Sequence, residues 1–286
     1  VPRVPARPTT RKARVVARSQ QIVRVDRETH EPLGPTPSRA LYAAVEAASS
    51  KVDGAILEDY GKGLFTRAPI RRIMALLAAA GVPVAVDPKG EIAPFKGASL
   101  VKPNLREAEE LAGIRCQTPR DLARIAARLR AKIGGGALAI TRGADGIHLF
   151  EGDAPGEGVS VPTPRREVFD VQGAGDTTIA ALVLALRAGA TLREAAVVAN
   201  AAAGTVVGKV GTATASRDEV RALLGDAVVA FVPGALEGEQ KLDLTKAPIW
   251  FGTPELPERV DAQRIAEEKQ LAQRVARELE DGFYVN

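Results

Sequence analysis

Residues 170–177 read Asp170-Val171-Gln172-Gly173-Ala174-Gly175-Asp176-Thr177 (DVQGAGDT), between a strand-like run and a long helix rich in alanine and leucine. Glycines on both sides of a small residue let backbone N–H groups point inward at a helix start, where the helix dipole favours negative charge. Gly173, Ala174 and Gly175 therefore predict an anion-binding cradle. Asp176 follows in the first helical turn, where a carboxylate can accept the proton of a hydroxyl that attacks a phosphoryl group. Acidic residues are also common at helix starts for electrostatic reasons alone, so this motif does not decide between the two interpretations.

Around this motif, from Ser38 to about Leu223, short apolar runs alternate with helical stretches. This alternation is typical of a parallel sheet that is covered by helices, so the predicted fold class is α/β. The pattern predicts helices capped by Ser38, Thr66, Asn104 and Thr118, and two long helices over 174–188 and 192–207. The expected strands are 54–57, 83–87, 99–102 and 137–141, with an antiparallel edge pair at 146–150 and 158–162.

The two ends of the chain differ from this core. Polar and apolar residues alternate over 14–26, which predicts half-exposed strands in a sheet outside the main layer. Residues 1–25 carry seven basic and no acidic side chains, which fits either a site for a phosphorylated substrate or a solvated strand. After Val232, four prolines mark an irregular linker before a charged amphipathic helix over 261–279. We therefore divide the chain into substrate-side strands (1–37), a core (38–232) and a linker with a helical tail (233–286).

Composition limits the classes of function. The 286 residues are 45% hydrophobic, which suits a large globular core, and the net charge of +4 is too small to indicate a nucleic-acid partner. Cys116 has no second cysteine to pair with, and no apolar stretch approaches the roughly 20 residues of a membrane span. We expect a cytoplasmic protein without a membrane or nucleic-acid partner, and a homodimer is compatible with the sequence.

Three motifs in order resemble the PfkB/ribokinase family of carbohydrate kinases. They are DVQGAGDT, Lys102-Pro103-Asn104-Leu105-Arg106-Glu107 and Thr141-Arg142-Gly143-Ala144-Asp145-Gly146. The resemblance covers residues 7 to about 224. It implies a ribokinase-like three-layer α/β/α fold with a mostly parallel central sheet, and a kinase that uses ATP and Mg²⁺.

The resemblance also implies roles for single residues. Asp176 would be the base that activates a sugar hydroxyl, while Gly173, Ala174 and Gly175 would stabilise the transferring phosphoryl group. Asn104 and Glu107 match a motif that organises Mg²⁺ and its waters, which agrees with the few protein oxygens that this ion needs. They also match a plain capping box, which is the competing interpretation. The nucleotide would further contact the strand-end loop and the following long helix, through Thr141, Arg142, Gly143, Gly146 and Asn200.

Within the family, the sequence is most similar to heptose 7-phosphate kinases of lipopolysaccharide-core synthesis. The segments that carry this likeness are 7–12, 18–26, 58–63 and 207–212. The likeness implies phosphate transfer to the C1 hydroxyl of a heptose already phosphorylated at C7. Cationic Arg14, Lys62 and Lys89 would lie near this anionic substrate and Asp59 would bind its hydroxyls, although each of the four could equally be a surface charge.

Compared with the family, this sequence lacks an opening strand with a sugar-binding aspartate and a Gly-Gly-Ala-Asn-like stretch. We therefore expect a ribokinase-like fold that is truncated at its N-terminus, with complete phosphate machinery and an incomplete sugar site. The alternative function is a catalytically silent nucleotide-binding remnant or an oligomerisation module. ATP binding without turnover would support that alternative.

Overall fold

The computed structural model describes residues 7–17, 20–152, 158–163, 170–209 and 211–224, together with Val4 and Gly156. The expected tail helix over 261–279 lies outside these residues. The described part of the chain is built around a six-stranded sheet in the order β3-β4-β5-β6-β7-β8. The strands are β3 (Ala55–Glu58), β4 (Val84–Asp87), β5 (Leu100–Val101), β6 (Ala137–Thr141), β7 (Ile147–Phe150) and β8 (Val159–Val161). β3 to β6 pair in parallel, while β7 and β8 add an antiparallel edge as predicted.

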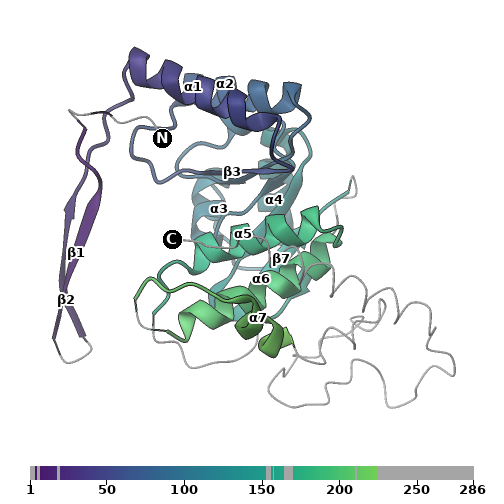
Figure 1. Ribbon diagram of the computed structural model, residues 1–286. Helices are drawn as coiled ribbons and strands as arrows, with labels where there is room; N and C mark the ends of the chain where they lie inside the picture. Colours follow the sequence, from purple (N-terminus) through teal and green to yellow (C-terminus); the bar gives the residue numbers. More distant parts are fainter. Residues whose placement is uncertain are drawn as a thin grey trace, which may run out of the picture.

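Helices cover both faces of the sheet. On one face lie α2 (Arg67–Ala79), α3 (Leu105–Ala112) and α4 (Pro119–Ile133), with α1 (Pro35–Ser49) packed beside α2, and their apolar side chains meet Leu57, Val86, Val101 and Ile140 of the strands. On the other lie α5 (Ala174–Arg187), α6 (Leu192–Val207) and α7 (Arg217–Leu224), which pack on Ala85, Leu100, Ala139 and Leu149. Figure 1 shows α5 and α6 on the opposite side of the sheet from α1 and α2. The three expected layers are therefore present.

The period of two along each strand decides which residues reach α5. Leu57, Val86 and Val101 contact the α2–α4 layer, so the residue after each of them points to the opposite face. These next residues are Glu58, Asp87 and Lys102, and Glu58 pairs in register with Asp87. Three charged side chains therefore stand at the carboxyl ends of neighbouring parallel strands, on the side where α5 lies.

Two of the four side chains predicted to cap a helix do so. The side chains of Asn104 and Thr118 each form a complete capping box, at the start of α3 and α4. Thr66 is the N-cap residue of α2, but its side chain makes no capping hydrogen bond. The prediction for Ser38 was wrong, because α1 begins at Pro35 and the Ser38 hydroxyl donates to the carbonyl of Leu33 instead. Proline in the first turn has a fixed φ that suits a helix start, which explains the earlier beginning.

A separate two-stranded sheet precedes the core. β1 (Arg11–Ala17) pairs antiparallel with β2 (Gln20–Arg27), and Figure 1 shows this hairpin projecting away from the layered body. Its described side chains from Ile22 to Arg27 are exposed. The prediction of strands outside the main layer is therefore confirmed. No helix in the described ranges is long and apolar enough to cross a membrane.

Candidate active site

The site lies where the carboxyl ends of β3, β4 and β5 meet the start of α5. Ligands of α/β proteins bind at this edge of the sheet, because the loops there are free to supply side chains. Asp176 stands in the first turn of α5 and its Oδ2 accepts a hydrogen bond of 2.8 Å from the Tyr60 hydroxyl, just beyond β3. Residues 116 positions apart in the sequence therefore meet in one site.

The start of α5 has the geometry of an anion cradle. Gly173 is the N-cap residue with a left-handed φ of 75°, which glycine adopts without strain, and no side chain caps the helix. The first amides of a helix have no carbonyl partner within it, and α5 presents Gly175 and Asp176 in this turn. A β-carbon at Gly175 would lie 3.7 Å from the Lys102 Nζ, so a positive charge stands directly beside the cradle.

Lys102 is a buried cation. Its side chain is 3% exposed and its Nζ lies 2.7 Å from Oδ2 of Asp87. Burial raises the pKa of Asp87, and Lys102 opposes this rise by charge and by hydrogen bonding. A buried ammonium is costly unless it is paired, so this lysine is held in place by its contact with Asp87.

Glu58 completes a cluster of carboxyl groups around Asp176. Burial, and then its hydrogen bond and charge interaction with Asp176, raise the pKa of Glu58 to about 8. Burial and a hydrogen bond to Asp176 also raise the pKa of Tyr60 well above its ordinary value. Both shifts in pKa favour the protonated forms of the Glu58 carboxyl group and the Tyr60 phenol.

The predicted magnesium residues lie at the start of α3. Asn104 Oδ1 accepts from the Glu107 N–H at 2.9 Å, and Glu107 Oε2 accepts from the Asn104 N–H at 3.0 Å. The other oxygen of Glu107, Oε1, lies 3.8 Å from the Nζ of Lys89, a side chain that is 60% exposed. The capping box is therefore real, and it leaves one carboxylate oxygen of Glu107 outside the cap. Within the described ranges, no group of three or more acidic, histidine or cysteine side chains could hold a metal ion.

The strand-end loop after β6 lies next to α3. The Thr141 N–H donates to the carbonyl of Pro103, and Thr141 forms a bridge with Asn104. Arg142 pairs with Asp145 at 3.3 Å, so its guanidinium already has an acidic partner. Gly143 has a φ of 57° and open space where a side chain would stand, so it offers accessible backbone.

Gly146 and Asn200 have clear structural roles. A β-carbon at Gly146 would lie 2.1 Å from the carbonyl oxygen of Val161, so only glycine allows this close approach to β8. Asn200 is buried in α6 and its Nδ2 donates to the carbonyls of Val161 at 2.9 Å and Pro162 at 3.1 Å. These contacts fix the end of β8 on α6, so the amide nitrogen of Asn200 is occupied by backbone.

Of the predicted substrate residues, Asp59 and Lys89 lie together, and the Asp59 carboxyl group accepts a hydrogen bond from the Lys89 backbone. Asp59 follows Glu58; its Oδ1 accepts from the Gly61 N–H at 2.8 Å, and burial raises the pKa of its carboxyl group. Lys62 forms an ion pair with Glu28, at the base of the β1–β2 hairpin. The side chain of Arg14 lies outside the described residues, although its backbone belongs to β1. Both described cations therefore have an acidic neighbour, but the Lys89 side chain is 60% exposed and that of Lys62 only 23%.

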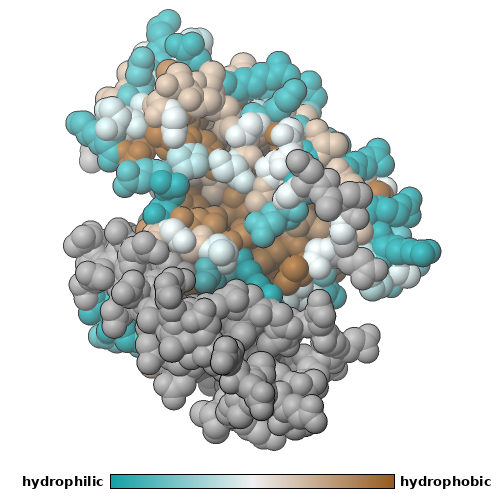
Figure 2. Space-filling model, turned by 90° about the vertical axis from the view of Figure 1, so that its right-hand side faces the viewer, coloured by the Kyte–Doolittle hydropathy of each residue, from teal (hydrophilic) through white to brown (hydrophobic). Residues whose placement is uncertain are grey.

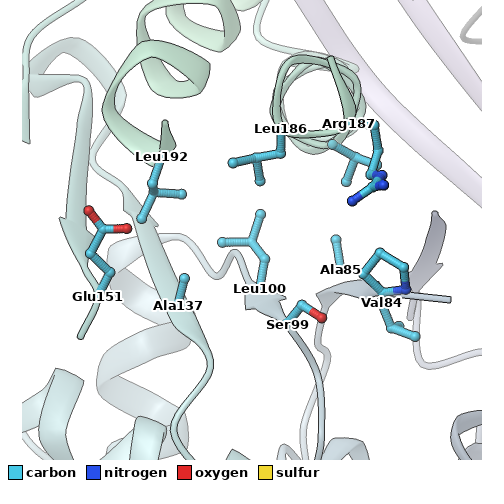
Figure 3. A pocket seen from close by; sticks show the side chains of 11 residues that line it. Val84, Ala85, Ser99, Leu100, Ala137, Glu151, Leu186, Arg187 and Leu192 are labelled. Carbon is cyan, nitrogen blue, oxygen red and sulfur yellow. The ribbon is translucent and has the colours of Figure 1, made fainter. Parts of the chain in front are cut away.

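A cavity of about 300 Å³ lies at the opposite edge of the sheet from Asp176. It is formed at the amino ends of β4, β5 and β6 beneath α5 and α6, and Figure 3 shows Leu100, Leu186 and Leu192 pointing into it between Glu151 and Arg187. Figure 2 views the molecule from the right-hand side of Figure 1, and it shows hydrophobic residues, in brown, gathered in a hollow of this face. The apolar lining is unsuited to phosphates, so this cavity is separate from the candidate active site.

Sequence reasoning missed Glu58, Tyr60 and Lys102 as functional residues. They belong to segments that the sequence analysis quoted, but no local pattern distinguished them from ordinary polar residues at strand ends. The available signal was the repetition of charged residues directly after buried apolar strands, at Glu58, Asp87 and Lys102. That signal becomes specific only when the strands are known to be parallel neighbours.

Comparison with known proteins relates this chain to a family. A family model described as pfkB family carbohydrate kinase matches residues 1–219. The bifunctional protein HldE of Geobacter metallireducens is 43% identical over 222 residues, which are 77% of this chain and 45% of that protein. The protein of the same name from Gluconacetobacter diazotrophicus is 44% identical over 221 residues, with 77% and 45% covered. The chain thus spans less than half the length of these curated relatives.

Solved structures agree on the fold. Escherichia coli phosphofructokinase-2 in complex with potassium superposes with a TM-score of 0.60 at 20% identity, covering 67% of this chain and 62% of that one. Arabidopsis thaliana ribokinase complexed with ribose and ATP gives a TM-score of 0.56 at 21% identity, with 71% and 65% covered. The ribokinase-like fold predicted from the motifs is confirmed, and the chain belongs to the pfkB family of carbohydrate kinases.

Proposed function

We propose that this chain transfers the γ-phosphate of ATP to a hydroxyl of a sugar phosphate. One observation carries the proposal: the carboxylate of Asp176 stands at the uncapped start of α5, beside the buried ammonium of Lys102, and already accepts a hydrogen bond from a hydroxyl, that of Tyr60. A base, an anion cradle and a fixed positive charge are the groups that phosphoryl transfer requires of a protein. ATP as the donor is supported by the ribokinase relative, which is complexed with ribose and ATP.

Each group has a defined task in this reaction. Asp176 accepts the proton of the attacking sugar hydroxyl as its oxygen forms a bond to the γ-phosphorus, while the bond from that phosphorus to the β,γ-bridging oxygen breaks and ADP leaves. The first turn of α5, at Gly173, Ala174 and Gly175, would turn backbone amides toward the negative charge that spreads over the transferring group, and the Ala174 N–H, which donates to the Val171 carbonyl at 3.4 Å, would have to share its hydrogen bond. Lys102 adds a cation that Asp87 keeps in position. Positioning and charge neutralisation are therefore supplied by groups that exist before substrate binds.

The residues at the start of α3 fit a magnesium ion that is held through water. Glu107 keeps one oxygen outside the capping box, and Mg²⁺ usually retains several waters and takes one or two carboxylates together with substrate phosphates. Asn104 would fix the orientation of Glu107 through the cap. When bound, the ion supplies charge neutralisation at the phosphates. Thr141 bridges Asn104, and Arg142 and Gly143 follow it directly in the chain, so all three would lie near the ion.

We further propose that the acceptor is heptose 7-phosphate and the product heptose 1,7-bisphosphate. The proposal is supported by the sequence likeness to heptose kinases and by the HldE relatives. Lys89, with its exposed ammonium near Glu107, is the cation of the predicted set that is best placed to meet an anionic substrate. Lys62 would have to exchange Glu28 for substrate phosphate.

Two measurements test the proposal. Calorimetric titration with ATP and Mg²⁺ should show binding, and a coupled assay should show ADP release that depends on heptose 7-phosphate and exceeds the release with ribose or fructose 6-phosphate. The Asp176→Asn variant serves as the control for contaminating kinases. Binding of ATP without turnover of any sugar phosphate would support the silent nucleotide-binding remnant instead.

A further inference from the structure

Three carboxyl groups surround a single buried ammonium in the active site. Glu58 and Asp87 project from neighbouring strands, Asp176 projects toward them from α5, and Lys102 is 2.7 Å from Asp87. Asp87 is the carboxylate that pairs with this ammonium, whereas the side chain of Glu58 makes its hydrogen bond with Asp176. Two carboxylates in hydrogen-bond contact cannot both be ionised at low cost, so they share a proton.

The shared proton belongs on Glu58. Glu58 is half-buried and forms a hydrogen bond with Asp176. The negative charges of Asp176 and Asp87 disfavour its ionised form, and the attraction of Lys102, which is the smallest of these effects, opposes them. Asp176, in the first turn of α5, already accepts a hydrogen bond from the Tyr60 hydroxyl at its Oδ2. The carboxyl group of Glu58 is therefore the donor and the carboxylate of Asp176 is the acceptor.

Tyr60 is the second donor to the same carboxylate. Its hydroxyl lies 2.8 Å from Asp176 Oδ2 and it also hydrogen bonds with Glu58. Glu58 and Tyr60 are two residues apart on the chain, so both leave the end of β3 toward α5. Two hydrogen bonds fix the plane of a carboxylate that would otherwise rotate freely.

We propose that Glu58 and Tyr60 are positioning residues for Asp176, with Glu58 acting in its protonated form as a hydrogen-bond donor. This inference rests on the proposed kinase function. It has a direct consequence for pH dependence. When Glu58 ionises, Asp176 loses a donor, and a further negative charge joins those of Asp87 and Asp176 at the place where phosphate must enter. The reaction should slow as the pH rises through the ionisation of Glu58.

Glu58→Gln is the informative variant, because its amide can still donate to Asp176 but cannot ionise. We expect the alkaline fall in kcat of the wild type, centred near pH 8, to be absent in Glu58→Gln. Glu58→Ala, which removes the donor, should lower kcat roughly 10- to 100-fold at neutral pH while KM for ATP changes little. Tyr60→Phe should lower kcat less and keep the alkaline fall. Glu46→Gln, the same chemical change on the exposed surface of α1, is the matched control.

A second measurement does not depend on turnover. Infrared difference spectra between about pH 6 and about pH 10 should show a protonated carboxyl band that disappears in the wild type and is missing from Glu58→Gln, since ordinary glutamates titrate well below this range. The same alkaline fall and the same band in wild type and Glu58→Gln would overturn the inference. A wild-type chain that shows the band but phosphorylates no sugar would overturn the proposed function alone.

Discussion

The Lys102–Asp87 pair offers a test of the site through stability. Asp87→Asn leaves a buried ammonium, 3% exposed, without its counter-charge. Breaking one partner of a buried ion pair typically costs about 3–5 kcal/mol, so we expect this loss in the free energy of unfolding. Lys102→Met should cost less, about 1–3 kcal/mol, because burial already raises the pKa of Asp87 and the unpaired carboxyl group can take up a proton.

The stability of the Lys102→Met variant should also depend on pH. Burial already raises the pKa of Asp87, and Lys102 is the group that lowers it most. Without Lys102 the pKa of Asp87 rises further, so the folded state binds this proton more tightly than the unfolded state. A raised carboxyl pKa contributes stability at low pH that is lost as the pH rises through the folded-state value. Lys102→Met should therefore approach wild-type stability under mildly acidic conditions and weaken toward alkaline pH.

Urea unfolding, followed by far-ultraviolet circular dichroism at neutral pH, measures both variants and the double variant Lys102→Met/Asp87→Asn. Removal of both charges should restore part of the loss, giving a coupling free energy of about 2–3 kcal/mol. The exposed pair Arg106–Glu110, with side chains 87% and 64% exposed, is the matched control and should couple by no more than about 0.5 kcal/mol. Equal coupling in the two cycles would refute the reasoning that Lys102 is a buried, locked cation. If the double variant is stable but its kcat remains low by about 10²-fold or more, the ammonium has a role in catalysis beyond folding.

Other substitutions test the remaining parts of the site. Asp176→Asn should lower turnover by roughly 10² to 10⁴ with nearly unchanged ATP affinity by calorimetry, and near-wild-type turnover would remove Asp176 from its role as base. Gly175→Val should weaken both ATP binding and turnover, because its side chain would enter the cradle beside Lys102, where a β-carbon already lies 3.7 Å from the Nζ. Gly146→Ala should destabilise the fold by about 2 kcal/mol or more, since its β-carbon would collide with the carbonyl of Val161 at a φ of +80°. An unchanged urea midpoint for that variant would contradict the close approach of β8.

Much of the fold follows from local sequence signals. The alternation of apolar runs with helical stretches predicts the sheet and its covering layers. No observed strand end in the main sheet differs from its predicted position by more than one residue. Asn104 and Thr118 have the side chains and spacing of capping boxes, and both form them. Ser38 shows the limit of such signals, because a proline three residues earlier starts the helix first.

The sequence by itself determined where we propose the phosphate end of the site, because an anion cradle is made of neighbouring backbone amides and is predicted from the local pattern of Gly173, Ala174, Gly175 and Asp176 alone. Only the tertiary structure decided what surrounds that carboxylate. Glu58, Asp87 and Lys102 come from three strands, and they meet because parallel pairing brings the strand ends together while the period of two turns all three toward α5. The protonation of Glu58 depends on burial and on charges that are distant in the sequence, which no local pattern specifies.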